Sequence, residues 1–266
     1  MKRLILLLLV TTTLLFGAHA KYDVTFSVFG KIGEADVSME RTKDTYLIII
    51  DAKTTGKAAD LSGNRHEKYI SQGKILDGLL VPDVLTIERS SDDKLEYTSF
   101  IFDHDEHNIS IEKAKIKTVT QSDIDIFSLA INYTYHEEFS ASNKYNDFYT
   151  QNDIVTLFFN ASHHLKDMDF GDEKTLQAVG VSTDNGEVAI AAPKYQQLQY
   201  MKKVMGSKNA EQFVRVGVSK DYFKDDDGAL LVSLSPDTFP QEAMMEGILM
   251  FGDVRAVRNY SHVALK

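Results

Sequence analysis

The chain has 266 residues, of which 43% are hydrophobic, including 15 Phe and 12 Tyr, so it can bury a core of one large all-β domain or two small ones. A formal net charge of −10 argues against nucleic acid and acidic lipid head groups as partners, because phosphates must be met by positive charge. No Cys is present, which excludes disulfides, thiolate metal sites and thiol catalysis.

The first twenty residues have the pattern of a secretory signal peptide. Lys2 and Arg3 form the charged start, an apolar run follows over residues 4–15, and Ala18-His19-Ala20 gives the small-x-small cleavage pattern. A retained membrane anchor is the alternative, but the apolar run is shorter than the ~20 residues that a spanning helix needs. The sequence therefore predicts a signal peptide over 1–20 and a single β-rich domain over 21–266, located in the periplasm and not spanning the membrane after cleavage.

The first half of the mature chain alternates apolar and polar residues with a period of two, which predicts half-exposed strands. Between Ile111 and Ala114 the alternation changes phase, and we interpret this change as a β-bulge near Glu112-Lys113 that bends the strand. The expected strands of this half cover residues 22–28, 35–39, 46–52, 85–87, 95–101 and 109–116.

The second half continues the strand pattern and adds the helical segments. An apolar helix is expected over 153–165 with Asn152 as its N-cap, a second over 193–205 after Pro193, and a short helical turn over 57–61. The polar stretch 137–151 is interpreted as an ordered surface connection. Further strands are expected at 127–135, 175–179, 187–191, 213–218, 229–235, 243–251 and 254–260, with tight turns at Asn185-Gly186 and Asp227-Gly228.

These patterns predict a mainly β fold. A single amphipathic helix and many half-apolar strands must cover each other's apolar faces. We therefore expect a curved antiparallel sheet or half-open barrel wrapped around one apolar helix, with one or two further short helices.

Several turn and packing positions carry a resemblance to a known family. They are Tyr22 to Phe26, Gly30 to Ala35, Thr54-Thr55-Gly56 with Ser62-Gly63-Asn64-Arg65, Phe100 to Asp103, Asn152 to Phe159, and Gly247 to Arg255. In these positions the chain resembles exported proteins of the bacterial family catalogued as domain of unknown function 3108. The resemblance implies a periplasmic, strand-rich protein of unsettled function, and it supplies no catalytic residues. Residues 120–151 match no pattern of that family.

The clusters of polar residues give only weak chemical signals. Asp103 to His107 places two imidazoles and three carboxylates together, a set that suits zinc, copper or nickel, but its position between two strands favours a simple turn. Residues 224–228 resemble a calcium loop, yet Phe223 and Leu234 then occupy ligand positions, so the pattern fails. No nucleophile elbow, phosphate-binding loop or zinc-protease motif occurs, and we expect neither an enzyme nor a bound cofactor or metal.

Two classes of function remain open. The favoured one is a non-enzymatic binding or structural adaptor protein of the cell envelope, whose partner is another envelope protein; the alternative is a periplasmic carrier of a lipid or other apolar ligand in the concave face of the sheet. Phe158 and Phe159 are the candidate ligand-binding residues. Neighbours on a helix diverge by about 100 degrees, so we expect one of them to fill the core and the other to face a groove or the sheet edge.

Overall fold

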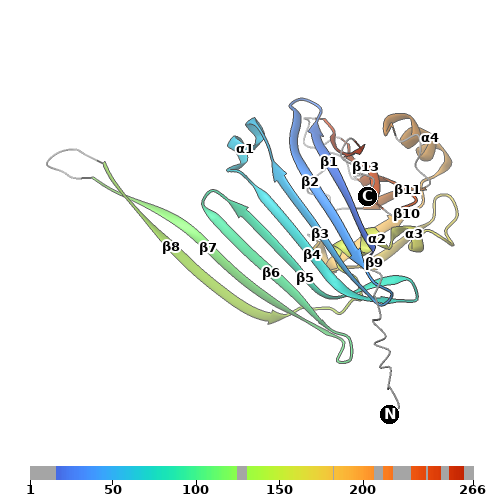
Figure 1. Ribbon diagram of the computed structural model, residues 1–266, viewed down its shortest axis with the longest axis horizontal. Coiled ribbons are helices and arrows are strands. Elements are labelled where there is room, and N and C mark those ends of the chain that lie inside the picture. The colour runs from blue at the N-terminus through green and yellow to red at the C-terminus, as the bar shows by residue number, and fades with distance from the viewer. Residues whose placement is uncertain are drawn as a thin grey trace, which may run out of the picture.

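The computed structural model describes residues 16–124, 131–181, 183–206, 212–217, 229–237, 239–246 and 252–260. Within these ranges every named strand belongs to one open antiparallel sheet of 14 strands (Figure 1). The strands are β1 (Phe16–Phe26), β2 (Gly30–Arg41), β3 (Thr45–Thr54), β4 (His66–Leu76), β5 (Leu79–Ser91), β6 (Lys94–Asp103), β7 (Asn108–Ile124), β8 (Ile131–Tyr145), β9 (Glu173–Gln177), β10 (Glu187–Ala191), β11 (Gln212–Gly217), β12 (Ala229–Leu234), β13 (Pro240–Met245) and β14 (Val254–Asn259).

The sheet consists of two meanders joined in its middle. Strands β1 to β8 follow one another in space as they do in sequence, and so do β9 to β14. The two runs are joined where β1 pairs with both β2 and β14. This order leaves β8 and β9 as the two edges of the sheet. The predicted mainly β class and the curved antiparallel sheet are confirmed.

The chain crosses from one edge of the sheet to the other between β8 and β9, and this crossing carries α2 (Ile154–Phe159) and α3 (Ala161–His164) over the concave face (Figure 1). Val155 of α2 packs with the buried side chains of the first meander, whereas Leu157 packs with those of the second. The short crossing helices therefore join the two halves of the core. They lie where the sequence predicts one apolar helix covered by the sheet.

Two further helices lie elsewhere. α4 (Tyr195–Val204) places Met201 against Phe213, Leu231 and Met244 in a third apolar cluster. α1 (Lys57–Ser62) is a short helix between β3 and β4 that ends at the left-handed Gly63. Both agree with helical segments expected from the sequence, and the turn expected at Asn185 falls in a 3-10 turn over Asp184–Gly186.

The structure corrects two interpretations of the region after residue 108. No bulge occurs near Glu112: the pairing of β7 with β6 and with β8 runs without a register shift there, and the shifts lie instead at Val24/Thr25, Gln72/Gly73 and Ser233/Leu234. The stretch 137–151 is not a surface connection over its first nine residues, because β8 extends to Tyr145. Its strand character is hidden because all its side chains from Tyr133 to Tyr145 are exposed.

The expected helix over 153–165 is divided at Asn160, where α2 ends and α3 begins. Its N-cap is Asp153, one residue later than expected. β1 begins at Phe16, so residues 16–20 of the predicted signal peptide pair with β2. The expected turn at 227–228 and the loop at 224–228 lie outside the described residues. No helix among the described residues combines the length and apolar character needed to cross a bilayer.

Candidate functional site

The two candidate ligand-binding residues lie on α2 and point to different parts of the core. Phe159 packs against the cluster of the first meander and makes an edge-to-face contact with the fully buried Phe239, with 5.5 Å between ring centroids. Phe158 packs against the cluster of the second meander. Both side chains are half-buried, and neither lines the cavities described below. Their role in ligand binding stays a prediction.

A buried polar network fixes the start of α2 against the sheet. The Asp153 carboxylate accepts hydrogen bonds from the Thr156 backbone N–H and from the Ser71 hydroxyl, both at 2.6 Å, and Ser71 lies 3.1 Å from the Tyr46 hydroxyl. Burial raises the pKa of Asp153 to about 6, and these hydrogen bonds lower it only in part. A group so enclosed has no access to a ligand, so we interpret the network as structural.

The end of α2 is held in the same way. The Asn160 side-chain amide donates to the Leu80 carbonyl at 2.9 Å and its oxygen accepts from the Leu80 N–H at 3.0 Å. Asn160 is buried, so these two hydrogen bonds satisfy the backbone groups of Leu80, which pairs with β4 but lies before the residues that pair with β6. These contacts hold α2 against β4 and β5.

The uncovered part of the concave face is polar. On β5 to β7 the side chains near α2 are apolar and buried, including Leu85, Phe102 and Ile109. Farther along the same face the apolar residues give way to a row of directly opposed residues from five strands. That row reads Glu67, Arg89, Glu96, Lys115, Ser140.

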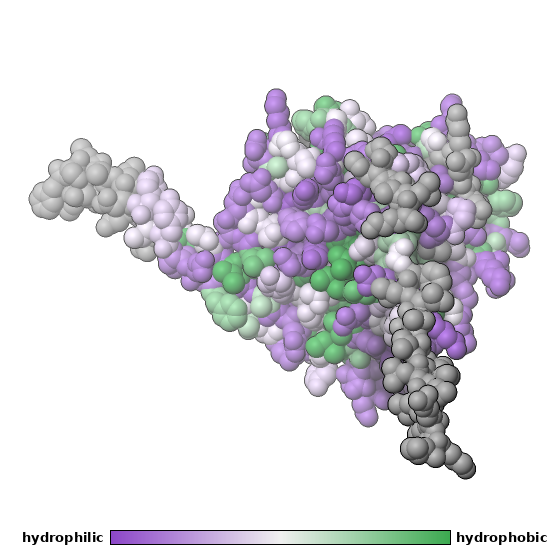
Figure 2. All heavy atoms as spheres, viewed as in Figure 1, coloured by the Kyte–Doolittle hydropathy of each residue, from purple (hydrophilic) through white to green (hydrophobic). Residues whose placement is uncertain are grey.

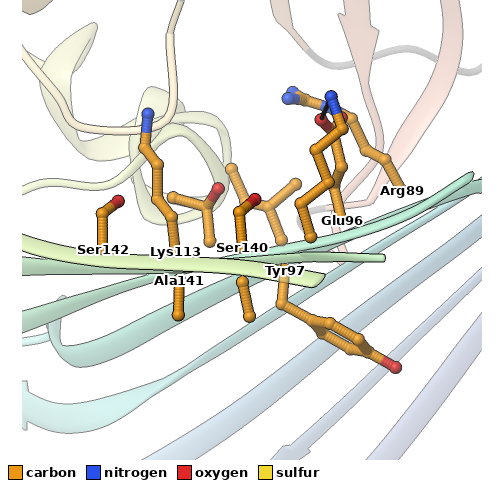
Figure 3. Close-up of a pocket in the computed structure, with 11 residues that line it drawn as sticks. Arg89, Glu96, Tyr97, Lys113, Ser140, Ala141 and Ser142 are labelled. Atoms are coloured by element: carbon orange, nitrogen blue, oxygen red, sulfur yellow. Dashed lines mark ion pairs between the residues drawn. The ribbon is translucent and has the colours of Figure 1, made fainter. Parts of the chain in front are cut away.

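We call this surface the cationic basin and define it by the concave-side residues of the row and its neighbours. It comprises Arg65, Glu67, Arg89, Lys94, Glu96, Thr98, Lys113, Lys115, Ser140 and Ser142. Two adjoining cavities of about 300 and 280 Å³ lie along it. Figure 3 shows Arg89, Glu96, Lys113, Ser140 and Ser142 on one side of the sheet, with Tyr97 and Ala141 pointing to the other.

The basin holds five cationic side chains and two carboxylates. Glu96 is paired with Lys94 at 2.7 Å and Lys115 at 3.5 Å, and the hydrogen bond from Lys94 lowers the pKa of Glu96. Glu67 is paired with Arg65 and Arg89. Lys113 has no carboxylate partner among the described residues. The basin therefore keeps an excess of positive charge in a protein whose net charge is −10.

The Asp103 to His107 segment is a turn. The Asp103 carboxylate accepts hydrogen bonds from the backbone N–H groups of Asp105 and Glu106. Both ring nitrogens of His104 are engaged, because Nε2 donates to the Pro82 carbonyl and Nδ1 lies 2.8 Å from the Tyr149 hydroxyl. No group of three or more metal-ligating side chains converges anywhere in the described part of the chain. The segment has the geometry of the favoured turn interpretation.

Comparisons with protein families, curated proteins and solved structures find no match. The resemblance to the family of domain of unknown function 3108 thus stays a prediction from the residues quoted above.

The sequence interpretation missed the cationic basin. A signal for it exists in the alternation of Lys113, Lys115 and Lys117, which places three cations on one face of β7. Their excess could not be recognised from sequence because the opposing carboxylate, Glu96, lies on a different strand and its register was unknown.

Proposed function

We propose that this protein is an exported, non-enzymatic binding protein of the cell envelope, whose cationic basin receives an acidic segment of a partner protein. The observation that carries the proposal is the concave surface of β4 to β8, where the basin brings five cations together with two carboxylates. Such a surface is unusual on an acidic protein, and a local cation excess attracts anionic groups, of which carboxylates are the ones a partner protein carries.

The serine and threonine side chains support the same ligand class. Thr98, Ser140 and Ser142 flank Lys113 and Lys115 on the concave side and supply hydroxyl donors for carboxylate oxygens. A nucleic acid is a poor alternative because the whole protein would repel it. The described residues of the basin include no nucleophile held by a base in the way that covalent catalysis needs, which favours binding over chemistry.

The alternative of a lipid carrier has less support. An apolar ligand would need an apolar concave surface, yet α2 and its packed neighbours already cover the apolar part of that face. The surface that α2 leaves open is lined by charges and hydroxyls.

The ligand class is tested with a short fluorescent poly-glutamate peptide as the probe. We expect saturable binding, measured by fluorescence anisotropy, that weakens as salt is raised and is lost in the Lys113→Glu/Lys115→Glu variant. Lys68→Glu/Lys53→Glu is the matched control, because it makes the same change of charge outside the basin. Equal binding by both double variants would contradict the proposal.

Export is tested separately. When residues 1–266 are expressed, we expect the protein to appear in the osmotic-shock fraction without residues 1–20. N-terminal sequencing would then give Lys21 as its first residue. Retention of residues 1–20 in a membrane fraction would contradict it.

A further inference from the structure

The two edges of the sheet differ in length and character. β9 is an edge strand of only five residues, and a very short edge is a common protection against pairing with another chain. β8 is a 15-residue edge without proline, and its pairing with β7 is the only strand pairing it makes among the described residues. One side of its backbone is therefore open to a further strand.

The β7–β8 hairpin also extends past the body of the sheet (Figure 1). β6 pairs with β7 only as far as Lys117, so the end of β7 pairs with β8 alone. Along the convex face of β8, inside and beyond the part that β6 reaches, four aromatic side chains are 58 to 71% exposed: Tyr133, Tyr135, Phe139 and Tyr145. Figure 2 shows hydrophobic residues gathered where the hairpin leaves the body. Exposed apolar side chains that follow an unpaired edge strand favour this edge as an interaction surface.

We propose that the occupant of this edge is a second copy of the chain, paired antiparallel through β8 about a two-fold axis at Ala141. A two-fold axis perpendicular to the sheet keeps concave residues on the concave side, so it pairs odd-numbered residues with odd and even with even. With Ala141 opposite its own copy, Glu138 lies opposite Lys144 of the second copy. The two-fold symmetry repeats this contact, so two equivalent ion pairs form on the concave face.

The same register groups the aromatic side chains on the convex face. Tyr145 lies opposite Glu137 of the second copy, and Tyr135 and Phe139 of that copy are its diagonal neighbours. Diagonal residues on adjacent strands remain within reach of aromatic side chains. Charge complementarity on one face and aromatic contact on the other thus occur in a single register.

Neighbouring registers lack the ion pair between Glu138 and Lys144, and this includes the register centred on Phe139, which places Tyr145 opposite Tyr133 but Lys144 opposite Thr134. Centring the axis on Glu137 or Glu138 places like charges directly opposite each other, which is destabilising. Centring it on Ser140 places Lys144 opposite His136, and centring it on Ser142 places Lys144 opposite Ser140. Pairing of β8 with β9 of another copy would be limited to five residues and would be head-to-tail, which generates a ring or an open chain of subunits instead of a two-fold dimer.

The first test uses the absence of cysteine from the chain. In the Ala141→Cys variant the two introduced thiols face each other with Cα atoms about 4.5 to 5.5 Å apart, within disulfide range. We expect mild oxidation to convert most of this variant to covalent dimer. The control is Glu137→Cys on the same exposed face, where the two thiols are roughly 26 Å apart along the strand. Equal cross-linking of both variants would overturn the proposed register.

The second test exchanges the charges. Each contact occurs twice, so Glu138→Lys or Lys144→Glu should weaken dimerisation about tenfold in sedimentation equilibrium. The Glu138→Lys/Lys144→Glu double variant should restore it. Each Glu138→Lys protein also loses the 3.6 Å contact of Glu138 with His136, so recovery in the double variant isolates the contact between copies. The proposal is overturned if the wild-type protein stays monomeric at millimolar concentration. It is also overturned if neither single substitution changes the dissociation constant of the dimer.

Discussion

The buried carboxyl of Asp153 makes the stability of the protein depend on pH in a direction opposite to that of a salt-bridged acid. Burial raises the pKa of Asp153 from 3.8 to about 6 in the folded state. Between these values the folded state binds a proton that the unfolded state has lost, so stability falls as pH rises. The contribution is fully present below pH 3.8 and is lost above about pH 6.

The magnitude follows from the two pKa values. The difference between 3.8 and about 6 corresponds to about 3 kcal/mol, since each pKa unit is worth about 1.4 kcal/mol. Asp153→Asn removes the ionisation and keeps an oxygen that can accept the hydrogen bond from the Thr156 N–H. Any loss of hydrogen bonding with Ser71 in this variant is independent of pH. Relative to the variant, the wild type should therefore lose about 3 kcal/mol between pH 3.5 and 7.

The assay is urea unfolding of both proteins at half-unit steps from pH 3.5 to 7. Every other group titrates in both proteins, so the difference in unfolding free energy isolates Asp153. Asp103→Asn serves as the control, because it makes the same change of charge at an exposed turn. A wild-type minus Asp153→Asn difference that stays constant to within about 0.5 kcal/mol would refute the argument from burial.

Four further substitutions test the packing of the crossing helix and the sheet. Asn160→Ala should reduce the unfolding free energy by about 2 to 4 kcal/mol, because it leaves a buried N–H and a buried carbonyl of β5 without partners. Gly73→Ala should prevent stable folding, since its Cβ would lie 2.1 Å from the Val81 carbonyl oxygen; circular dichroism checks this. We expect Phe159→Ala to lower the melting temperature more than Phe158→Ala, and Phe158→Ala to weaken ligand or partner binding. Equal losses of unfolding free energy of about 3 to 5 kcal/mol in the two variants would mean that both residues only fill the core.

The fold class was predictable because, in the first meander, the alternation of apolar and polar residues along the sequence matches the alternation of buried and exposed side chains. In β2 and β3 the residues that alternate as apolar, such as Val37, Met39 and Ile48, are the ones buried against the core. The same holds for α2, where the spacing of Val155 and Leu157 follows from packing against both halves of the sheet. Where one face is buried and the other exposed, periodicity alone determines the element.

The exact start of α2 was harder to place because Asn152 and Asp153 are equally good capping residues. The choice depends on Ser71, 82 positions earlier, which donates to the second oxygen of Asp153. A partner so distant in sequence cannot be identified without knowing how β4 lies against the helix. The division of the helix at Asn160 depends in the same way on Leu80.

The phase change in β7 that suggested a bulge has another physical cause, and it connects the two proposals. Ile109 and Ile111 lie on the concave face beneath the cover of the core, whereas Ala114 and Ile116 lie on the convex face beside Ala141 and Phe139. The pairing of the strand continues here without a register shift, and what reverses is the environment of its two faces. Where the helical cover ends, the concave face becomes charged and the convex face becomes apolar. Pairing of β8 with a second copy would bring the apolar convex sides of the two copies together and place two cationic basins next to each other across Ser140 and Ser142. A partner carrying two acidic segments would then bind the dimer more tightly than either basin alone, because its second segment binds at a high effective concentration.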